Sequence, residues 1–153
     1  MNKYKKIGID VRISKKAEIT RPEIVSLGNH ISIDSWVYIS TQIEAGGNFT
    51  NIGTGSRIVC ATDDFKQGMI SPVVPLKYRT IINESVIFED YATLGVNCVV
   101  LPGVTLSEGT IVGANSLIIK STKPWTIYAG SPAREIGPRD KTRAQNAARE
   151  MGY

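Results

Sequence analysis

The sequence is poor in histidine and cysteine, with one histidine, His30, and two cysteines, Cys60 and Cys98, among 153 residues. A zinc site built from three histidines cannot be assembled from one histidine per chain, so we expect no metal. Both cysteines fall inside the repeat described below, which favours core packing over a disulfide.

The sequence also lacks long apolar runs. No segment approaches the about 20 apolar residues that a membrane-spanning helix needs, and no apolar core follows the basic start Met1–Lys6. We therefore expect a cytoplasmic protein with neither a membrane span nor a signal peptide. The net charge of +4 is modest. It argues against nucleic acid as a partner and leaves a polyanionic small molecule such as a nucleotide open.

Large apolar residues recur at every sixth position in the second half of the chain. The series is Ile82, Phe88, Leu94, Val100, Leu106, Val112 and Ile118. Small or β-branched residues lie four positions after each of the first six, at Val86, Ala92, Cys98, Val104, Thr110 and Ser116. A period of six fits neither an amphipathic helix nor an alternating strand. It predicts an all-β solenoid, a parallel β-helix of three-sided coils that bury their apolar side chains against one another.

The same period covers the first half of the chain with interruptions. Its members are Ile7, Ile13, Ile19, Leu27, Ile33, Ile39, Ile52 and Ile58. The phase slips at Arg21–Pro22 and over residues 42–51, and it is lost from residue 63 to about residue 80. We expect a β-helix over residues 1–123 with an external loop at about 63–80, and a C-terminal extension over 124–153 with a short helix that Asp140 caps. A long excursion from a regular scaffold is usually functional.

The segment from Leu94 to Ile136 reads LGVNCVVLPGVTLSEGTIVGANSLIIKSTKPWTIYAGSPAREI. It resembles the end of the hexapeptide-repeat acyltransferases. The resemblance implies a left-handed parallel β-helix, a homotrimer with active sites between neighbouring subunits, and transfer of an acetyl or other acyl group from acyl-coenzyme A. Residues 28–34 and 62–65 are similar to a branch that acts on sugars in surface-polysaccharide biosynthesis.

The start of the external loop departs from the family pattern. Many members have a catalytic histidine there, whereas this chain reads Ala61-Thr62-Asp63-Asp64-Phe65. Asp63 and Asp64 are the first candidates for orienting an acceptor and taking its proton, because one carboxylate of an adjacent pair can be made more basic by the other. The alternative is a solvated turn. His30 is the second candidate base, although a surface or subunit contact suits its corner position three residues after Leu27 equally well.

The resemblance also places coenzyme A along the outside of the coils near the C-terminal end. The small residues Gly95, Gly113 and Ala114 leave room for a pantetheine arm to approach the backbone. Lys120 and Arg134 are candidates for binding the phosphates, or else they are ordinary exposed cations.

These features predict an acyl-CoA-dependent sugar acyltransferase. A nucleotide-linked amino sugar is the expected acceptor, because a neutral amine attacks a thioester with less help from a base than a hydroxyl needs. Two alternatives stay open: O-acetylation of a sugar hydroxyl, and a non-catalytic solenoid scaffold. A zinc carbonic anhydrase of the same fold is excluded, because it needs three histidine ligands at each site.

Overall fold

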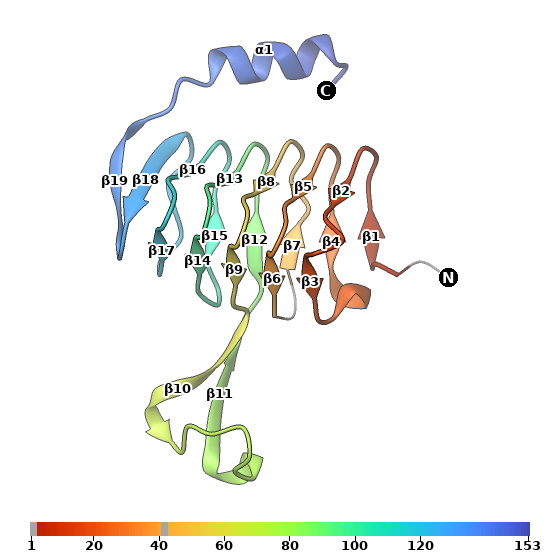
Figure 1. The fold of residues 1–153 in the computed structure, drawn as a ribbon. Coiled ribbons are helices and arrows are strands. Elements are labelled where there is room, and N and C mark those ends of the chain that lie inside the picture. The colour runs from red at the N-terminus through yellow and green to blue at the C-terminus, as the bar shows by residue number, and fades with distance from the viewer. Residues whose placement is uncertain (1–2, 41–42) are drawn as a thin grey trace.

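The computed structural model describes residues 3–40 and 43–153. Three parallel β-sheets form the walls of a three-sided prism, and each coil of the chain contributes one short strand to each wall (Figure 1). This is the parallel β-helix that the six-residue period predicts.

Each sheet is a stack of short strands from successive coils. The first sheet contains, in order, β1 (Lys6–Ile7), β4 (Ser26–Leu27), β7 (Ile43–Ala45), β12 (Val86–Phe88) and β15 (Thr105–Leu106). The second contains β2 (Arg12–Ile13), β5 (Ser32–Ile33), β8 (Asn51–Ile52), β13 (Thr93–Leu94), β16 (Ile111–Val112), β18 (Thr126–Gly130) and β19 (Ala133–Pro138). The third contains β3 (Glu18–Ile19), β6 (Tyr38–Ile39), β9 (Arg57–Ile58), β14 (Val99–Val100) and β17 (Leu117–Ile118). We call the turn from the first sheet to the second the first corner. The turn from the second sheet to the third is the second corner, and the turn from the third back to the first is the third corner.

The two predicted series fill the prism between Val86 and Ile118. Every member of both series in this range is at most 2% exposed. The strand register pairs Leu94 with Val112 and Val100 with Ile118, so one coil consists of three six-residue sides. The apolar residues of each coil are therefore covered by those of the coils above and below, as in other solenoids.

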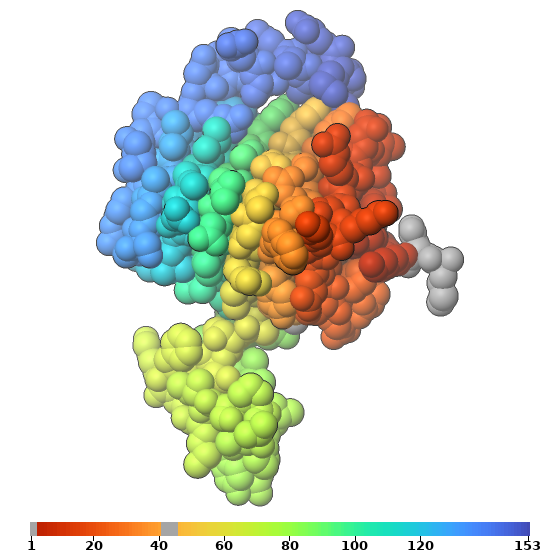
Figure 2. Space-filling model, viewed as in Figure 1, coloured from red at the N-terminus to blue at the C-terminus, as the bar shows by residue number. Residues whose placement is uncertain are grey.

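Ile82 is the one wrong member of the series, because it is 36% exposed and lies in β11 (Arg79–Asn83). Strands β10 (Ala61–Gly68) and β11 form an antiparallel hairpin, with the short 3-10 helix η2 (Leu76–Tyr78) between them. The hairpin leaves the prism at the third corner, and the chain returns only at β12. Figures 1 and 2 show it projecting from the body on the side opposite the C-terminal helix. The predicted loop is thus an ordered arm, and residue 82 has the correct spacing without lying in a coil.

The slips of the period are small insertions. The 3-10 helix η1 (Pro22–Ile24) lies between β3 and β4, which lengthens that coil so that Ile7 pairs with Leu27. Strand β7 keeps the phase and pairs with β4 and β12, and one extra residue follows it before Ile52. Residues 43–45 are therefore in phase, contrary to expectation, while residue 42 lies outside the described residues.

The residue three positions after a core hydrophobic forms the corner and takes a positive φ. Examples are His30 (54°), Tyr91 (61°) and Asn97 (58°). Backbone hydrogen bonds join the corners of adjacent coils, as where the N–H of His30 donates to Ile9 O at 2.9 Å. Corner residues of successive coils consequently form columns along the prism.

Beyond residue 123, β18 adds to β16 in parallel, and β19 folds back on it in antiparallel fashion. Helix α1 (Thr142–Glu150) then returns alongside the prism (Figure 1). Asp140 Oδ1 accepts a hydrogen bond of 2.8 Å from the N–H of Thr142, although Lys141 occupies the N-cap position, so the helix begins one residue later than the sequence predicts. The domain division at residue 123 stays a prediction. Within the described ranges, no helix has the length and apolar character needed to cross a membrane.

Candidate active site

A pocket opens at the third corner, where the hairpin leaves the prism. Its volume is about 370 Å³, and its lining consists of Thr62, Asp63, Asp64, Phe65, Lys66, Ile82, Glu84, Leu101, Pro102 and Ile119. The hairpin supplies the polar side of the pocket, and the corner residues of two coils supply the apolar side. The structure therefore brings both predicted carboxylates to one pocket and adds a third, Glu84.

Arg79 binds both carboxylate oxygens of Asp63. Its Nε donates to Asp63 Oδ1 at 2.9 Å, and its Nη2 donates to Asp63 Oδ2 at 3.0 Å. Each of the two side chains is 12% exposed. Such a two-point, charge-assisted contact is strong and geometrically specific. Because the two residues lie on the two strands of the hairpin, Asp63 stiffens its base, and its catalytic role stays a prediction.

Asp64 instead holds a local turn. The N–H of Lys66 donates to Asp64 Oδ1 at 2.9 Å, and Gln67 Nε2 donates to Oδ2 at 3.2 Å. The first of these contacts is an Asx turn, the alternative that the sequence left open. A carboxylate has about four acceptor positions, so two neutral donors leave Asp64 able to accept another hydrogen bond or a proton.

Glu84 is the pocket residue that the sequence analysis missed. It follows β11 directly, where the chain returns to the prism. Its carboxylate occupies the space that a Cβ on Gly103 would fill, and Gly103 has a φ of 76° that favours glycine. Its place in the sequence could have indicated it, because Glu84 ends the same excursion from the repeat that Asp63 and Asp64 begin.

A second cleft, of about 210 Å³, adjoins the pocket on the side of the C-terminal coils. Its lining consists of Ile118, Ile119, Lys120, Ser121, Tyr128, Ala133, Arg134 and Glu135. Ile119 lines both cavities, so the two lie next to each other, and we call the pair the third-corner groove. The structure thus brings Lys120 and Arg134, the predicted phosphate ligands, to one end of a groove that has carboxylates at its other end.

Comparisons with known proteins identify relatives of this fold, although no family model matches the sequence. The dTDP-4-amino-4,6-dideoxy-D-glucose acyltransferase of Escherichia coli is 29% identical over 161 residues, which span 90% of this chain and 84% of that protein. AntD of Bacillus cereus, an N-acyltransferase solved with dTDP and 3-hydroxybutyryl-CoA, has a TM-score of 0.79 at 27% identity, covering 98% of this chain and 91% of AntD. The hexapeptide-repeat acetyltransferase VCA0836 of Vibrio cholerae has a TM-score of 0.78 at 21% identity, over 90% of this chain and 76% of that protein.

Over nearly its whole length this chain is similar to acyltransferases that act on amino sugars. This similarity supports the resemblance seen in residues 94–136. The fold confirms the predicted class, a left-handed parallel β-helix built from hexapeptide repeats.

In this chain, His30 lies at the first corner and not in the third-corner groove. Its Nε2 is 3.0 Å from the hydroxyl of Tyr153, and its Nδ1 is 3.2 Å from Asp10 Oδ2. Its ring stacks on that of Phe49 at 5.0 Å. The structure does not bring His30 together with the pocket carboxylates within one chain. Its role as a base stays a prediction, and its contacts are those of a packed corner residue.

The predicted cofactor residues Gly95, Gly113 and Ala114 lie at the second corner. A Cβ on Gly95 would come within 2.8 Å of Ala114 N and 2.9 Å of Val112 O, so Gly95 is needed for the close approach of two coils. A Cβ on Gly113 would meet Ala129 Cβ at 3.2 Å. Lys120 follows β17 at the third corner, whereas Arg134 is the strand partner of Ala129, the residue against which Gly113 packs. Contact of the three small residues with coenzyme A stays a prediction that the packing does not require.

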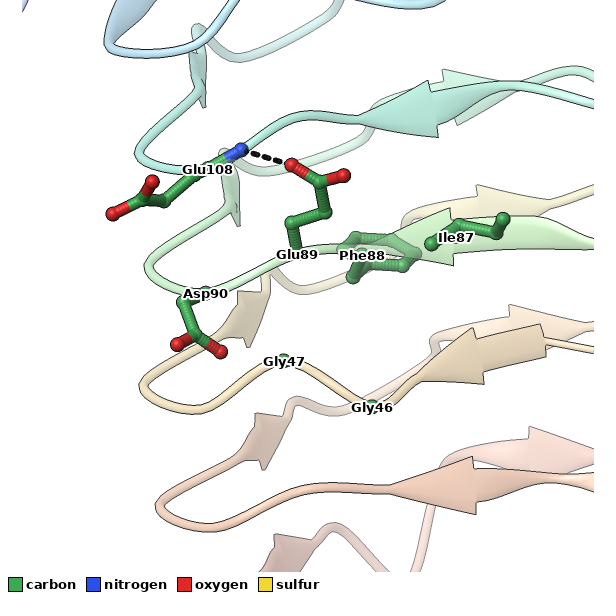
Figure 3. A pocket seen from close by; sticks show the side chains of 7 residues that line it. All are labelled: Gly46, Gly47, Ile87, Phe88, Glu89, Asp90 and Glu108. Carbon is green, nitrogen blue, oxygen red and sulfur yellow. Dashed lines mark hydrogen bonds between the residues drawn. The ribbon is translucent and has the colours of Figure 1, made fainter. Parts of the chain in front are cut away.

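A different acidic pocket, of about 400 Å³, lies near the first corner (Figure 3). Its carboxylates belong to Glu89, Asp90 and Glu108, beside Gly46–Gly47. Glu89 Oε2 accepts from the N–H of Glu108 at 2.8 Å, and Asp90 Oδ1 accepts from the N–H of Asn48 at 2.6 Å. Figure 3 shows Glu89 reaching the adjacent coil. Two of the carboxylates therefore join coils, and the described part of the chain holds no group of three metal-ligating side chains that could bind an ion.

Both cysteines are buried, as the sequence predicts. Burial raises the pKa of the Cys98 thiol, and its Sγ donates to Gly113 O at 3.2 Å. A thiol held protonated inside the prism is a packing group and not a nucleophile.

Proposed function

We propose that this chain transfers a short acyl group from acyl-coenzyme A to the amino group of a nucleotide-linked sugar. The observation that carries the proposal is the third-corner groove. Its first cavity has carboxylates beside Leu101, and Ile119 borders both cavities. The second cavity has Lys120 and Arg134, beside a Glu135 that is paired with Lys123. Coenzyme A has a matching order of groups, with a thioester, a pantetheine arm and phosphates.

In this assignment Lys120 and Arg134 bind the phosphates, for which Arg offers a planar set of donors and Lys a mobile point charge. The pantetheine arm lies against Leu101 and Ile119. The thioester then reaches the carboxylate end of the groove. The zinc alternative plays no part, because one histidine per chain does not supply its ligands.

The reaction needs one nucleophilic attack and one proton transfer. The amine nitrogen forms a bond to the thioester carbonyl carbon, the carbon–sulfur bond breaks, and coenzyme A leaves. Asp64 or Glu84 accepts the proton that the nitrogen loses, and the leaving sulfur gains a proton to become a thiol. A neutral amine is a good enough nucleophile for a carboxylate to suffice as proton acceptor. This fits a pocket that contains carboxylates in place of the family's histidine.

The acceptor class follows the relatives that span most of the chain. AntD has also been solved as a variant with dTDP-4-amino-4,6-dideoxyglucose and coenzyme A, at 25% identity and a TM-score of 0.79. Two other Escherichia coli relatives carry names of lipopolysaccharide and colanic acid biosynthesis, at 30% and 28% identity, and the chain spans 57% and 71% of their lengths. We accordingly place the product in surface-polysaccharide biosynthesis and the protein in the cytoplasm.

We also infer that three chains assemble into a homotrimer in which the hairpin lies on a neighbour. The hairpin projects from the prism (Figure 2). Apolar side chains along it are exposed, with Phe65 at 77% and Val73 at 91%. Contiguous exposed apolar surface marks an interaction site.

The test is release of coenzyme A thiol from acetyl-CoA and 3-hydroxybutyryl-CoA, with dTDP-4-amino-4,6-dideoxyglucose as acceptor and the 4-hydroxy sugar as control. We expect turnover with the amine alone and an amide product that resists alkaline hydroxylamine. A hydroxylamine-labile product from the hydroxyl control would replace N-acylation by O-acetylation. No thiol release, together with no binding of coenzyme A, would establish the scaffold alternative.

A further inference from the structure

The column of residues at the second corner contains one aromatic ring with an open face. From coil to coil the column runs Lys16, Trp36, Gly55, Asn97 and Asn115. Backbone bonds fix this order, since the N–H of Trp36 donates to Lys16 O at 3.2 Å and the N–H of Gly55 donates to Ser35 O at 3.0 Å. Lys16 Nζ lies 5.0 Å from the centroid of the Trp36 ring and covers one of its faces.

The next position in the column after Trp36 is Gly55, which has no side chain to lie against the ring. In the described part of the chain, a Cβ on Gly55 would meet one atom within 4 Å beyond its sequence neighbours, Asn97 Oδ1 at 3.7 Å. Trp36 is 61% exposed. A gap therefore separates the indole of Trp36 from the amide of Asn97, and we call it the Trp36–Gly55 gap.

The first corner shows what such a gap holds. Gly109 interrupts a column of stacked rings there, and a Cβ on Gly109 would clash with the indole of Trp125. That indole lies over Tyr91, with 5.5 Å between ring centroids. A glycine in a corner column thus leaves room for one planar ring, which at the first corner comes from the chain itself.

We infer that the Trp36–Gly55 gap binds the base of the acceptor's nucleotide, an inference that rests on the proposed function. A base inserted there stacks on Trp36, opposite Lys16. Asn97 Nδ2 donates to Asn115 Oδ1 at 2.8 Å, which leaves Asn97 Oδ1 directed at the gap as an acceptor. A pyrimidine such as thymine or uracil offers a ring N–H donor to such an oxygen.

The surroundings of the gap suit the rest of a nucleoside diphosphate sugar. Arg57 lies two residues after Gly55 on β9, and its guanidinium carbon is 5.7 Å from the ring centroid of Tyr38 on the outer side of the third sheet. Its charge, with that of Lys16, complements the diphosphate. From Arg57 the same coil continues directly into β10. The third sheet therefore leads from the gap, past a cation, to the carboxylates at the hairpin base.

The test measures binding of dTDP to the intact protein by calorimetry and by tryptophan fluorescence. We expect dTDP to quench the fluorescence of the wild type. Trp36→Phe should bind dTDP with little change and lose the quench, because phenylalanine also stacks. Trp36→Ala should weaken dTDP at least about tenfold while the affinity for coenzyme A stays unchanged.

Gly55→Asn is a second variant that fills the gap and leaves Trp36 in place. Asparagine occupies the same corner position at Asn97 and Asn115, each with a φ of 58°, so the backbone at Gly55 accepts it. We expect the same loss of dTDP binding with an unchanged melting temperature. Gly137→Ala is the matched control, since a Cβ there has no neighbour within 4 Å.

Two results would overturn the inference. The first is unchanged dTDP binding in both Trp36→Ala and Gly55→Asn. The second is a change of molar mass in both variants by light scattering, which would assign the gap to a side chain of a neighbouring subunit. If neither variant affects thiol release with the dTDP-amino sugar as acceptor, acyl transfer stands and the base site is rejected. If both variants abolish dTDP binding and the wild type releases no thiol, the base site stands and acyl transfer is rejected.

Discussion

At the scale of residues, two adjacent aspartates have different tasks because neighbouring positions on a strand face opposite ways. Asp63 is held at both oxygens by Arg79, whereas Asp64 meets only a backbone N–H and an amide. The acceptor positions of Asp63 are therefore taken up by Arg79, whereas Asp64 keeps positions open to a substrate. This favours Asp64 and Glu84 over Asp63 as proton acceptors, with Asp63 as a positioning residue.

Substitution of each carboxylate separates these tasks. Asp63→Asn leaves Arg79 without its countercharge, and we expect it to lower the free energy of unfolding by about 1–3 kcal/mol in urea denaturation. Asp64→Asn should leave stability within about 0.5 kcal/mol and lower kcat for thiol release at least about a hundredfold. Glu84→Gln is the parallel variant for the second candidate. Full activity in both Asp64→Asn and Glu84→Gln would rule out carboxylate catalysis in this pocket.

The spacing of residues predicted the core and missed the contacts that build the pocket. Leu94 and Val112 could be placed in the core because the period is regular where they lie. Arg79 and Asp63 are 16 positions apart in a segment with no period, so no spacing rule could pair them. Glu84 was missed for the same reason, because its task depends on how the hairpin returns to the prism.

At the scale of elements, helix α1 and the segment before it cover a column of aromatic rings at the first corner. His30, Phe49, Tyr91 and Trp125 follow one another, with 5.0, 5.3 and 5.5 Å between successive ring centroids. Tyr153 packs edge-on against His30 and Phe49. Insertions make the sequence distances between these residues unequal, so a fixed period does not predict the column. The column explains the position of the single histidine without catalysis.

Arg139 fastens the C-terminal segment to this column. Its Nη1 donates to Tyr91 O at 3.0 Å and to Gly109 O at 2.9 Å, and its guanidinium carbon lies 5.3 Å from the Trp125 ring centroid. We expect Arg139→Met to lower the free energy of unfolding by about 1–3 kcal/mol, because two carbonyls lose their donor. The exposed Arg134→Met is the matched control. It should weaken coenzyme A binding and leave stability within about 0.5 kcal/mol. Weaker coenzyme A binding in Arg139→Met together with lower stability in Arg134→Met would contradict both assignments.

The start of α1 makes the helix sensitive to acid. A hydrogen bond from the backbone N–H of Thr142 lowers the pKa of Asp140 from its ordinary value of 3.8. Because the folded-state pKa is the lower one, the ionised carboxylate stabilises the helix above pH 3.8, and this stabilisation is lost as the pH falls through the folded-state pKa. Asp140→Ala should lower the melting temperature at pH 7 and have no effect once Asp140 is protonated in both states. Glu150→Ala, at the other end of the helix, should not lower it. A loss in Asp140→Ala that is equal at every pH would contradict the assignment.

At the scale of the whole molecule, the prism and the hairpin differ in where their apolar side chains lie. The prism buries its apolar side chains within the chain, while the hairpin exposes its own to solvent. The sequence could locate this excursion from the loss of the period. It could not show that an arm with exposed apolar side chains would result, because no pattern within residues 63–80 distinguishes a hairpin from a loop.

The proposed homotrimer predicts that damage to the arm both separates the subunits and stops catalysis. Leu76 is 68% exposed and Val73 is 91% exposed, both far from the prism core. The double variant Val73→Asp, Leu76→Asp places two charges on the arm, and burying an unpaired charge in an interface is strongly unfavourable. We expect light scattering to change from three times the 16.7 kDa chain mass to a single chain. Thiol release should be lost with it, while circular dichroism stays that of a folded β-helix. The control Ile136→Asp changes an apolar residue on β19 that is 65% exposed and lies outside the hairpin. A single-chain mass for the wild type, or full activity in the dissociated variant, would show that each prism works alone.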